Sequence, residues 1–298
     1  MRGVIDYLKM NDVEYKENLS FKELTTIRLG GSAAVVAYPE SVCELIKLVR
    51  FLEKTNIKFK IIGNMSNILP PSGLYNGVII KTARLNSIYT EGEVVISECG
   101  ITLPLLAHKL APLGIGGLEN LSGIPATIGG AVVGNAGAFG GEISDFVRFV
   151  TVYSHSQDKI ITLTKEQLEF SYRSSILKKS QYTVLTVALS LYNTDPYESK
   201  RKISEYREER CRTQPYEYPS LGSVFKRPIG HYAARLIDSL GLKGYIVGGA
   251  QVSEKHAGFI LNKSNATPED VKELVLYIQE RVRTEFGISL EKEIEYLE

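Results

Sequence analysis

Net charge, cysteine and long apolar runs are all scarce in this chain of 298 residues. The 35 basic and 34 acidic residues nearly cancel. Nucleic acids and anionic membranes favour proteins with net positive charge, so this balance argues against either as the main partner. A local basic patch for one phosphorylated small molecule is compatible with it.

The three cysteines, Cys43, Cys99 and Cys211, lie far apart in the sequence. No pair has the spacing of a metal finger or a redox motif, and an odd number closes no disulfide framework. We therefore expect buried, reduced thiols, no metal site and a reducing compartment, which favours the cytoplasm. No stretch reaches the ~18 apolar residues of a membrane-spanning helix, and the first residues lack a signal-peptide core. Export and membrane insertion are not expected.

The length and an apolar content of 44% allow two or three domains with a sizeable core. Apolar residues at helical spacing predict a helix over residues 41–55. A charged helical segment begins near residue 197 and breaks at Pro215 and Pro219. Strand-like runs occupy residues 59–62, 78–81, 94–97, 149–153 and 184–191. Together these patterns predict an α/β layer first and place domain boundaries near residues 85 and 200.

The last segment has the clearest helix signals. Thr267 is a capping residue, Pro268 suits the first helical position, and Asp270 completes a capping-box pair. Gly287 is expected to end the helix. The predicted buried stripe consists of Val271, Leu274, Val275, Ile278, Val282 and Phe286.

Residues 114–141 hold ten glycines and few charges. Glycine removes the side chain and permits positive φ, so backbone amides can approach a ligand closely. Paired glycines also serve tight turns and bulges in β-proteins. The segment matches neither a P-loop nor a Rossmann fingerprint. Composition alone leaves a ligand cradle and a turn-rich scaffold about equally favoured.

Other segments gain meaning only in combination. Residues 63–67, Gly-Asn-Met-Ser-Asn, follow a strand and could form an anion-binding turn or an ordinary surface turn. Ser223 has no nucleophile-elbow context and by itself reads as a turn serine. Arg173 and Glu293 by themselves read as surface charges.

Taken in order, these segments resemble the UDP-N-acetylenolpyruvoylglucosamine reductase family over nearly the whole chain. The matching motifs are residues 25–31 (TTIRLGG), 62–69 (IGNMSNIL), 117–131 with 135–138, Tyr172-Arg173, 219–228 (PSLGSVFKRP), 248–257 (GGAQVSEKHA) and Glu293-Ile294. The shortness of the chain resembles the type II subgroup, which lacks an inserted substrate-capping loop.

The resemblance implies an α+β fold. Its parts would be a two-part FAD-binding region of the vanillyl-alcohol-oxidase (PCMH) type, residues 1–85 and 86–200, and a C-terminal α+β substrate-binding domain, residues 201–298. It also implies hydride transfer from NADPH to FAD and then to the enolpyruvyl group of a UDP-sugar. The product would be UDP-N-acetylmuramate for peptidoglycan synthesis. The sequence does not fix the oligomeric state.

The same resemblance assigns roles to three side chains. Arg173 would stabilise the negative charge that develops toward the substrate carboxylate, with a bidentate guanidinium. Ser223 would protonate the adjacent carbon of the strongly basic enolate. Glu293 would assist at the carboxylate or in proton transfer, and burial should raise its pKa if it acts as an acid.

The resemblance also implies residues that bind the ligands. The cofactor-binding candidates are Gly63, Asn64, Met65, Ser66, Asn67, Gly123, Ile124, Thr127, Gly129, Gly130, Asn135, Gly137 and Ala138. The substrate-binding candidates are Arg212, Lys226, Arg227, Gln251 and Lys255.

The chain departs from the family pattern at three places. Met65 stands where the first flavin loop usually has glycine; a positive φ there would strain a methionine by about 1–3 kcal/mol. Pro70-Pro71-Ser72 replaces a small apolar residue and an acid, and Arg227 replaces a common asparagine. The altered flavin loop supports one alternative, a degenerate homologue that binds flavin or UDP-sugar without turnover. A second alternative is a related flavin oxidoreductase with another substrate, against which the retained Arg173, Ser223 and Glu293 argue.

Overall fold

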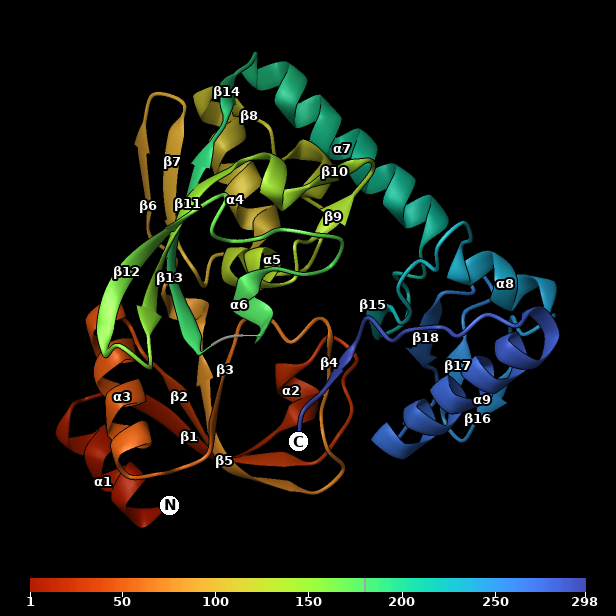
Figure 1. Cartoon of the computed structure of the whole chain (residues 1–298), viewed down its shortest axis with the longest axis horizontal. Helices are drawn as coiled ribbons and strands as arrows, with labels where there is room; N and C mark the ends of the chain where they lie inside the picture. Colours follow the sequence, from red (N-terminus) through yellow and green to blue (C-terminus); the bar gives the residue numbers. More distant parts are fainter. Residues whose placement is uncertain (180) are drawn as a thin grey trace. The chain divides into compact units, whose positions relative to one another are not determined.

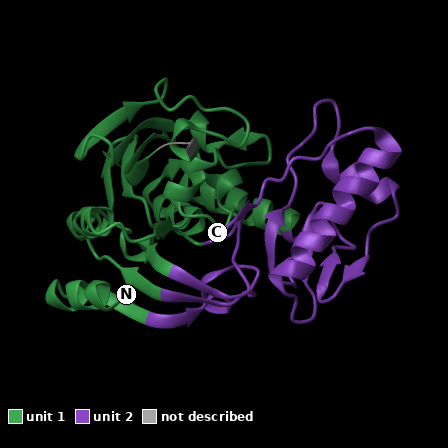
Figure 2. Ribbon diagram, turned by 60° about the horizontal axis from the view of Figure 1, so that its bottom comes forward, with its two compact units in different colours: residues 1–16, 35–64, 77–210 green, residues 17–34, 65–76, 211–298 purple. Residues whose placement is uncertain are grey.

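A computed structural model describes residues 1–179 and 181–298. The chain forms two compact units, each assembled from separate stretches of sequence (Figure 2). Unit 1 comprises residues 1–16, 35–64 and 77–210, and unit 2 comprises residues 17–34, 65–76 and 211–298. The division of the first 200 residues into two subdomains near residue 85 stays a prediction.

The first part of the chain forms a four-stranded sheet with helices on one face (Figure 1). Its strand order is β1 (Glu14–Ser20), β2 (Ser32–Tyr38), β5 (Leu74–Lys81) and β3 (Phe59–Ile62). The short helix α2 (Phe21–Leu24) follows β1, and the two-residue strand β4 (Ile68–Leu69) precedes β5. Helices α1 (Arg2–Met10) and α3 (Val42–Lys54) bury their apolar stripes in the core of unit 1. This packing removes Leu8, Leu45 and Leu52 completely from solvent.

A five-stranded antiparallel sheet forms the rest of the unit 1 core. Its strand order is β12 (Lys159–Thr164), β11 (Val147–Ser154), β13 (Tyr182–Ser190), β7 (Val94–Glu98) and β6 (Ile88–Glu91). Helix α5 (Ile128–Val133) contacts β7 and β13, so the glycine-rich segment lies against this sheet. The other helices and strands of this region are η1 (Thr82–Arg84), α4 (Leu103–Leu110), η2 (Ala111–Leu113), β8 (Ile115–Gly116), η3 (Glu119–Leu121), β9 (Gly137–Ala138), β10 (Gly141–Glu142), η4 (Ile143–Asp145), α6 (Ile176–Lys179), β14 (Tyr192–Asn193) and α7 (Pro196–Thr213).

Unit 2 is an antiparallel sheet with two helices. The strand order is β15 (Ser220–Ser223), β18 (Phe259–Asn262), β17 (Ala250–Val252) and β16 (Ile246–Val247). Helices α8 (Ala233–Ser239) and α9 (Pro268–Phe286) contribute to its separate core. The last strand, β19 (Glu295–Tyr296), pairs in parallel with β4.

The predicted elements are confirmed with few exceptions. Helix α3 has Ser41 as its cap, and α9 has the predicted Thr267–Asp270 capping box and a left-handed Gly287 after it. All the predicted strand runs overlap strands. Phe286, assigned to the buried stripe of α9, is 38% exposed, because it lies in the last turn beyond the core.

The cysteine prediction was wrong in part. Cys99 is buried, and burial raises the pKa of its thiol to about 12. Cys43 and Cys211 are free but exposed, each on a helix face that points away from its core.

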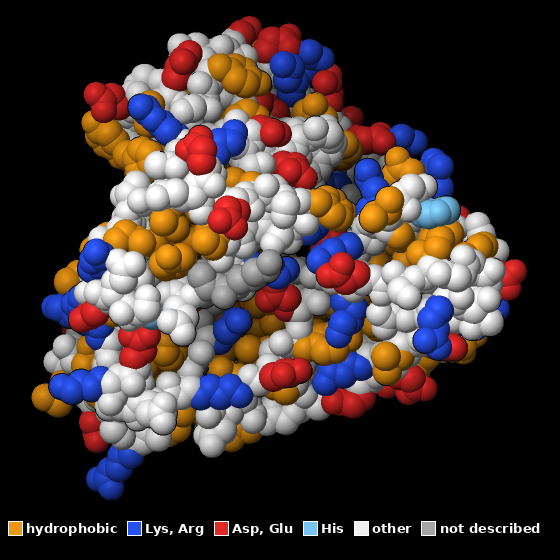
Figure 3. Space-filling view, in the orientation of Figure 1, with side chains coloured by type: hydrophobic (Ala, Val, Ile, Leu, Met, Phe, Trp, Pro, Cys, Tyr) orange, Lys and Arg blue, Asp and Glu red, His pale blue; other side chains and the backbone are white. Residues whose placement is uncertain are grey.

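Basic and acidic side chains are interspersed on the face shown in Figure 3. None of the described helices combines the length and apolar character needed to cross a bilayer.

Candidate functional site

The first candidate flavin loop packs against the glycine-rich segment inside unit 1. A Cβ placed on Gly63 would lie 2.1 Å from the Thr127 hydroxyl oxygen, so no side chain fits there. The Asn64 side-chain amide donates to the Pro125 carbonyl oxygen at 2.8 Å. Two segments separated by about sixty residues of sequence are therefore brought together.

The glycines of the glycine-rich segment allow close packing as well as access to the backbone. Thr127 caps α5 by accepting a hydrogen bond from the Gly130 amide at 3.2 Å. The Gly129 amide donates to the Cys99 carbonyl, and a Cβ on Gly129 would lie 2.9 Å from the Cys99 Cβ. A Cβ on Gly123 would meet the Arg210 side chain at 2.7 Å. Close packing against Cys99 and Arg210 accounts for Gly129 and Gly123, while Ile124 and Ala138 are partly exposed beside them.

Arg173 lies at the far end of the same segment. It occupies a two-residue turn closed by the Ser171–Ser174 bridge, and its φ of 55° is left-handed. Its guanidinium donates to the Asn135 and Gly137 carbonyl oxygens at 3.5 and 3.3 Å. The structure thus places the predicted catalytic arginine against the predicted cofactor segment, with long and weak hydrogen bonds that a carboxylate could replace.

Asn135 is the residue that ties these parts together. Its side-chain amide donates to the Glu142 carboxylate at 2.8 Å and to the Ser171 carbonyl at 3.0 Å, and its side-chain oxygen accepts from the Ser144 amide at 3.2 Å. The side chain is 1% exposed. These contacts are all within the protein, so the side chain of Asn135 holds the segment in place, and its contact with a cofactor stays a prediction.

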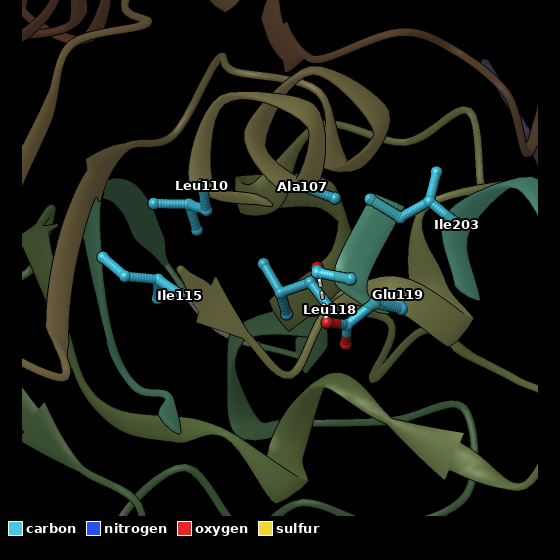
Figure 4. Close-up of a pocket in the computed structure, with 7 residues that line it drawn as sticks. Ala107, Leu110, Ile115, Leu118, Glu119 and Ile203 are labelled. Atoms are coloured by element: carbon cyan, nitrogen blue, oxygen red, sulfur yellow. Dashed lines mark hydrogen bonds between the residues drawn. The ribbon is translucent and has the colours of Figure 1, made fainter. Parts of the chain in front are cut away.

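Glu119 stabilises the start of the glycine-rich segment and was not singled out from the sequence. Its carboxylate accepts from the Gly117 amide at 2.8 Å and from the Ser199 hydroxyl of α7 at 2.7 Å. It borders a small cavity otherwise lined mainly by apolar side chains, among them Leu110 and Ile203 (Figure 4). Its position beside glycines is the feature of the sequence that could have drawn attention to Glu119. Its burial depends on α7, which is distant in sequence, so the motif alone does not predict it.

Unit 2 brings Ser223 and Glu293 together. Ser223 ends β15, and its hydroxyl makes a long contact, 3.4 Å, with the Phe225 carbonyl. The Glu293 amide donates to the carbonyl of Val224, the next residue, at 2.8 Å. Asn67 contributes from the flavin loop by donating to the Glu293 carbonyl at 3.0 Å. Two motifs 70 positions apart thus converge.

His256 is a further neighbour of Ser223 that the motif contained but the sequence argument did not use. A Cβ on Gly258 would lie 3.0 Å from the His256 ring and 3.4 Å from the Ser223 hydroxyl oxygen, so both groups border one small space. The Gly258 amide donates to His256 Nδ1 at 3.2 Å. Burial is the main cause that lowers the pKa of His256, which favours the neutral ring.

Met65 and Ser66 complete the first flavin loop in unit 2. Met65 has a φ of 47° and is 3% exposed, so the strain expected from its departure from glycine is present. The prolines that follow are accommodated: a Cβ on Gly30 would lie 2.6 Å from the Pro70 ring, and the Gly31 amide donates to the Pro71 carbonyl at 2.8 Å.

The substrate-binding candidates of unit 2 have protein partners. Lys226 forms an ion pair with Glu291, and the Arg227 guanidinium lies 4.6 Å from the Tyr232 ring centre. Lys255 donates to the Cys211 carbonyl at 2.6 Å. Gln251 is buried and donates to the Gly244 carbonyl at 3.2 Å, and Arg212 is exposed. Their substrate contacts stay predictions. Among the described residues, no cluster of histidine, cysteine and acidic side chains could hold a metal ion.

The residues of unit 1 fit FAD. Gly63 lies against Thr127 where the two loops meet, and the ammonium of Lys81 lies beside Gly63 with no carboxylate paired to it in the described part of the chain. Residues 33–164 match a family described as an FAD binding domain. Residues 214–297 match the C-terminal domain of UDP-N-acetylenolpyruvoylglucosamine reductase.

Relatives cover nearly the whole chain. A UDP-N-acetylenolpyruvoylglucosamine reductase from Caldanaerobacter subterraneus is 43% identical over 93% of this chain and 91% of its own length. One from Caldicellulosiruptor bescii is 40% identical over 98% of this chain and 93% of its own length. The crystal structure of a UDP-N-acetylenolpyruvylglucosamine reductase from Thermus caldophilus superposes with a TM-score of 0.79, at 35% identity, over 96% of this chain and 99% of that one.

Fold and site together define a flavoprotein oxidoreductase, with an α+β FAD-binding region of the PCMH type and a separate C-terminal α+β domain. The chain belongs to the UDP-N-acetylenolpyruvoylglucosamine reductase family. The resemblance seen in its motifs is thereby confirmed.

Proposed function

We propose that Arg173, Ser223 and Glu293 carry out the substrate half of a UDP-N-acetylenolpyruvoylglucosamine reductase reaction in this protein. The enzyme is an NADPH-dependent flavoprotein reductase that forms UDP-N-acetylmuramate for peptidoglycan synthesis. Bound FAD supplies the hydride chemistry between NADPH and the enolpyruvyl double bond. The single observation that carries the assignment is the bond from the Glu293 amide to the carbonyl of Val224, the residue after Ser223, which joins the two motifs that contain these predicted catalytic residues.

Arg173 is suited to recognise the substrate carboxylate. Negative charge moves toward that carboxylate when hydride adds to the double bond, and a fixed cation beside it lowers the barrier. The two outer nitrogens of Arg173 donate to two carbonyl oxygens, at 3.3 and 3.5 Å. A planar guanidinium can exchange these weak bonds for a bidentate pair with a carboxylate, which is shorter and stronger.

Ser223 is suited to deliver the proton. Its hydroxyl contacts the Phe225 carbonyl at 3.4 Å, so the proton is not committed to a strong internal bond. The backbone that follows it is fixed by two bonds of Val224, whose amide donates to the Gly258 carbonyl and whose carbonyl accepts from the Glu293 amide. A weak acid can protonate a strongly basic enolate when it is held in place. Glu293, half-buried beside it, would assist this transfer.

The test separates the two half-reactions in Ser223→Ala. Reduction of bound flavin by NADPH should stay within about twofold of wild type. Reoxidation by the enolpyruvyl UDP-sugar should slow by about 10²–10⁴, the usual contribution of a positioned acid. Ser220→Ala is the matched control, since it removes a hydroxyl from the same strand and should change neither half.

The outcome also decides between the alternatives. Equal slowing of both half-reactions by Ser223→Ala would show that the serine's role is wrongly assigned. Wild-type protein that binds FAD but is not reduced by NADPH would indicate a binding protein without turnover. Reoxidation only by another acceptor would indicate a different oxidoreductase.

UDP-sugar and NADPH are small-molecule partners, and the free cysteines support the cytoplasm as the proposed compartment.

A further inference from the structure

A partly buried lysine lies at the point where the first flavin loop begins. Lys81 is the last residue of β5, and its ammonium donates to the Gly63 carbonyl at 3.1 Å. Strands β3 and β5 are parallel and pair Ile62 with Lys81. Their carboxyl ends therefore lie at one edge of the sheet, and this places Lys81 directly beside the loop that follows β3.

The charge of Lys81 is poorly compensated. The side chain is partly buried, and desolvation lowers the pKa of its ammonium. Across residues 1–179 and 181–298, no carboxylate forms an ion pair with it, and the Gly63 carbonyl is its hydrogen-bond acceptor. An ammonium has three donors, so one carbonyl satisfies a third of them. A buried charge without a counter-charge is costly to the folded protein.

The surroundings of Lys81 are those of the candidate cofactor cradle. Gly63 touches Thr127, and Asn64 donates to Pro125, so Lys81 stands where the first loop meets the glycine-rich segment. The neighbouring Thr82 hydroxyl is already used, since it donates to the Ile62 carbonyl at 3.2 Å. The ammonium is therefore the strong donor that this edge retains for a ligand oxygen.

We propose that Lys81 binds the diphosphate of FAD, supplying the positive charge that the backbone of the two flavin loops lacks. The proposal rests on the assignment of Gly63–Asn64 and the glycine-rich segment as those loops. FAD carries two negative charges on its diphosphate, and a charge-assisted hydrogen bond from an ammonium is well suited to one of them. Binding would give the buried ammonium its missing counter-charge.

A structural alternative makes a different prediction. If Lys81 only held the Gly63 carbonyl, a neutral donor of similar length would serve equally well. Lys81→Gln keeps a donor and removes the charge, whereas Lys81→Arg keeps the charge. The two readings therefore assign opposite behaviour to this pair of substitutions.

The experiment measures FAD binding to the apoprotein by flavin fluorescence. Lys81→Gln and Lys81→Met should each raise the Kd for FAD on the order of tenfold to a hundredfold, and Lys81→Arg should keep it within a fewfold. The difference between wild type and Lys81→Met should shrink at high salt. Lys60→Met is the matched control, because Lys60 is an exposed lysine on the adjoining strand β3, and it should leave the Kd unchanged.

Thermal unfolding of the apoprotein gives a second readout independent of catalysis. Lys81→Met should melt no lower than wild type without FAD, because a poorly compensated buried charge is removed, but should gain less from added FAD. Wild-type affinity in Lys81→Gln would overturn the proposal, as would an equal loss in the Lys60→Met control. Failure of the wild-type protein to bind FAD at all would instead refute the loop assignment itself.

Discussion

At the strained Met65 of the first flavin loop, we expect the usual order of stability between an alanine and a glycine substitution to be reversed. Met65 combines a φ of 47° with almost complete burial, at 3% exposure. A non-glycine residue in the left-handed region costs about 1–2 kcal/mol. Glycine removes that cost, but truncation of a buried methionine costs about 2–5 kcal/mol.

These magnitudes decide the sign. Met65→Gly should lower stability overall, because the loss of packing exceeds the relief of strain. Met65→Ala loses nearly the same packing and keeps the strain. The glycine variant should therefore be more stable than the alanine variant by about 1 kcal/mol, although at an ordinary position glycine is worse than alanine by about 0.5–1 kcal/mol.

Leu69 offers the matched control. It is 1% exposed and lies in β4, in the extended conformation of a strand. There the ordinary order should hold, with Leu69→Ala more stable than Leu69→Gly. Thermal unfolding of the apoproteins measures both pairs, and 1 kcal/mol corresponds to about 2–4 °C in a protein of this size range. If Met65→Ala melts above Met65→Gly, the strain argument is refuted.

Two further predictions concern the predicted catalytic Arg173 and His256, the neighbour of Ser223. Arg173→Lys keeps the charge but loses the planar guanidinium, so reoxidation of the flavin by substrate should slow by about 10²-fold while FAD affinity is unchanged. Stopped-flow absorbance measures the reoxidation rate. Equal rates in the variant and the wild type would show that the arginine does not take part in the reaction. The pKa of His256 is lowered in the folded protein, so the unfolded chain takes up a proton near pH 6.5 and the folded protein only at lower pH. The contribution of His256 to stability is therefore present above pH 6.5 and is lost as the pH falls. His256→Gln should therefore flatten the loss of thermal stability between about pH 7.5 and 5.5, whereas His231→Gln, at an exposed position, should not.

Local chemistry in the sequence accounts for the helices. Thr267, Pro268 and Asp270 satisfy or remove the free amides at the start of α9, and Gly287 accepts the left-handed turn at its end. These signals act between residues a few positions apart, so the sequence contains all of them. Phe286 shows the limit of periodicity, because its exposure depends on where the core ends and not on its place in the repeat.

The glycine-rich segment could not be interpreted from composition. Particular neighbours require these glycines: Gly129 of the segment lies against Cys99, and Gly63 of the first flavin loop lies against Thr127 of the segment. Those contacts join segments that are distant in sequence, so spacing does not reveal them. The resemblance to a family predicts which loops bind the flavin, but the reason that glycine stands at each position is tertiary.

The sequence by itself determined the ordered motifs, the helix ends and the family. The tertiary structure decided which groups meet. The motifs of Ser223 and Glu293 meet through one long-range backbone hydrogen bond, from Glu293 to Val224, and Lys81 reaches Gly63 because two parallel strands end at the same edge. Met65 is strained only because the loop around it adopts a left-handed turn. Each of these depends on chain segments that fold together, and no local pattern in the sequence encodes that contact.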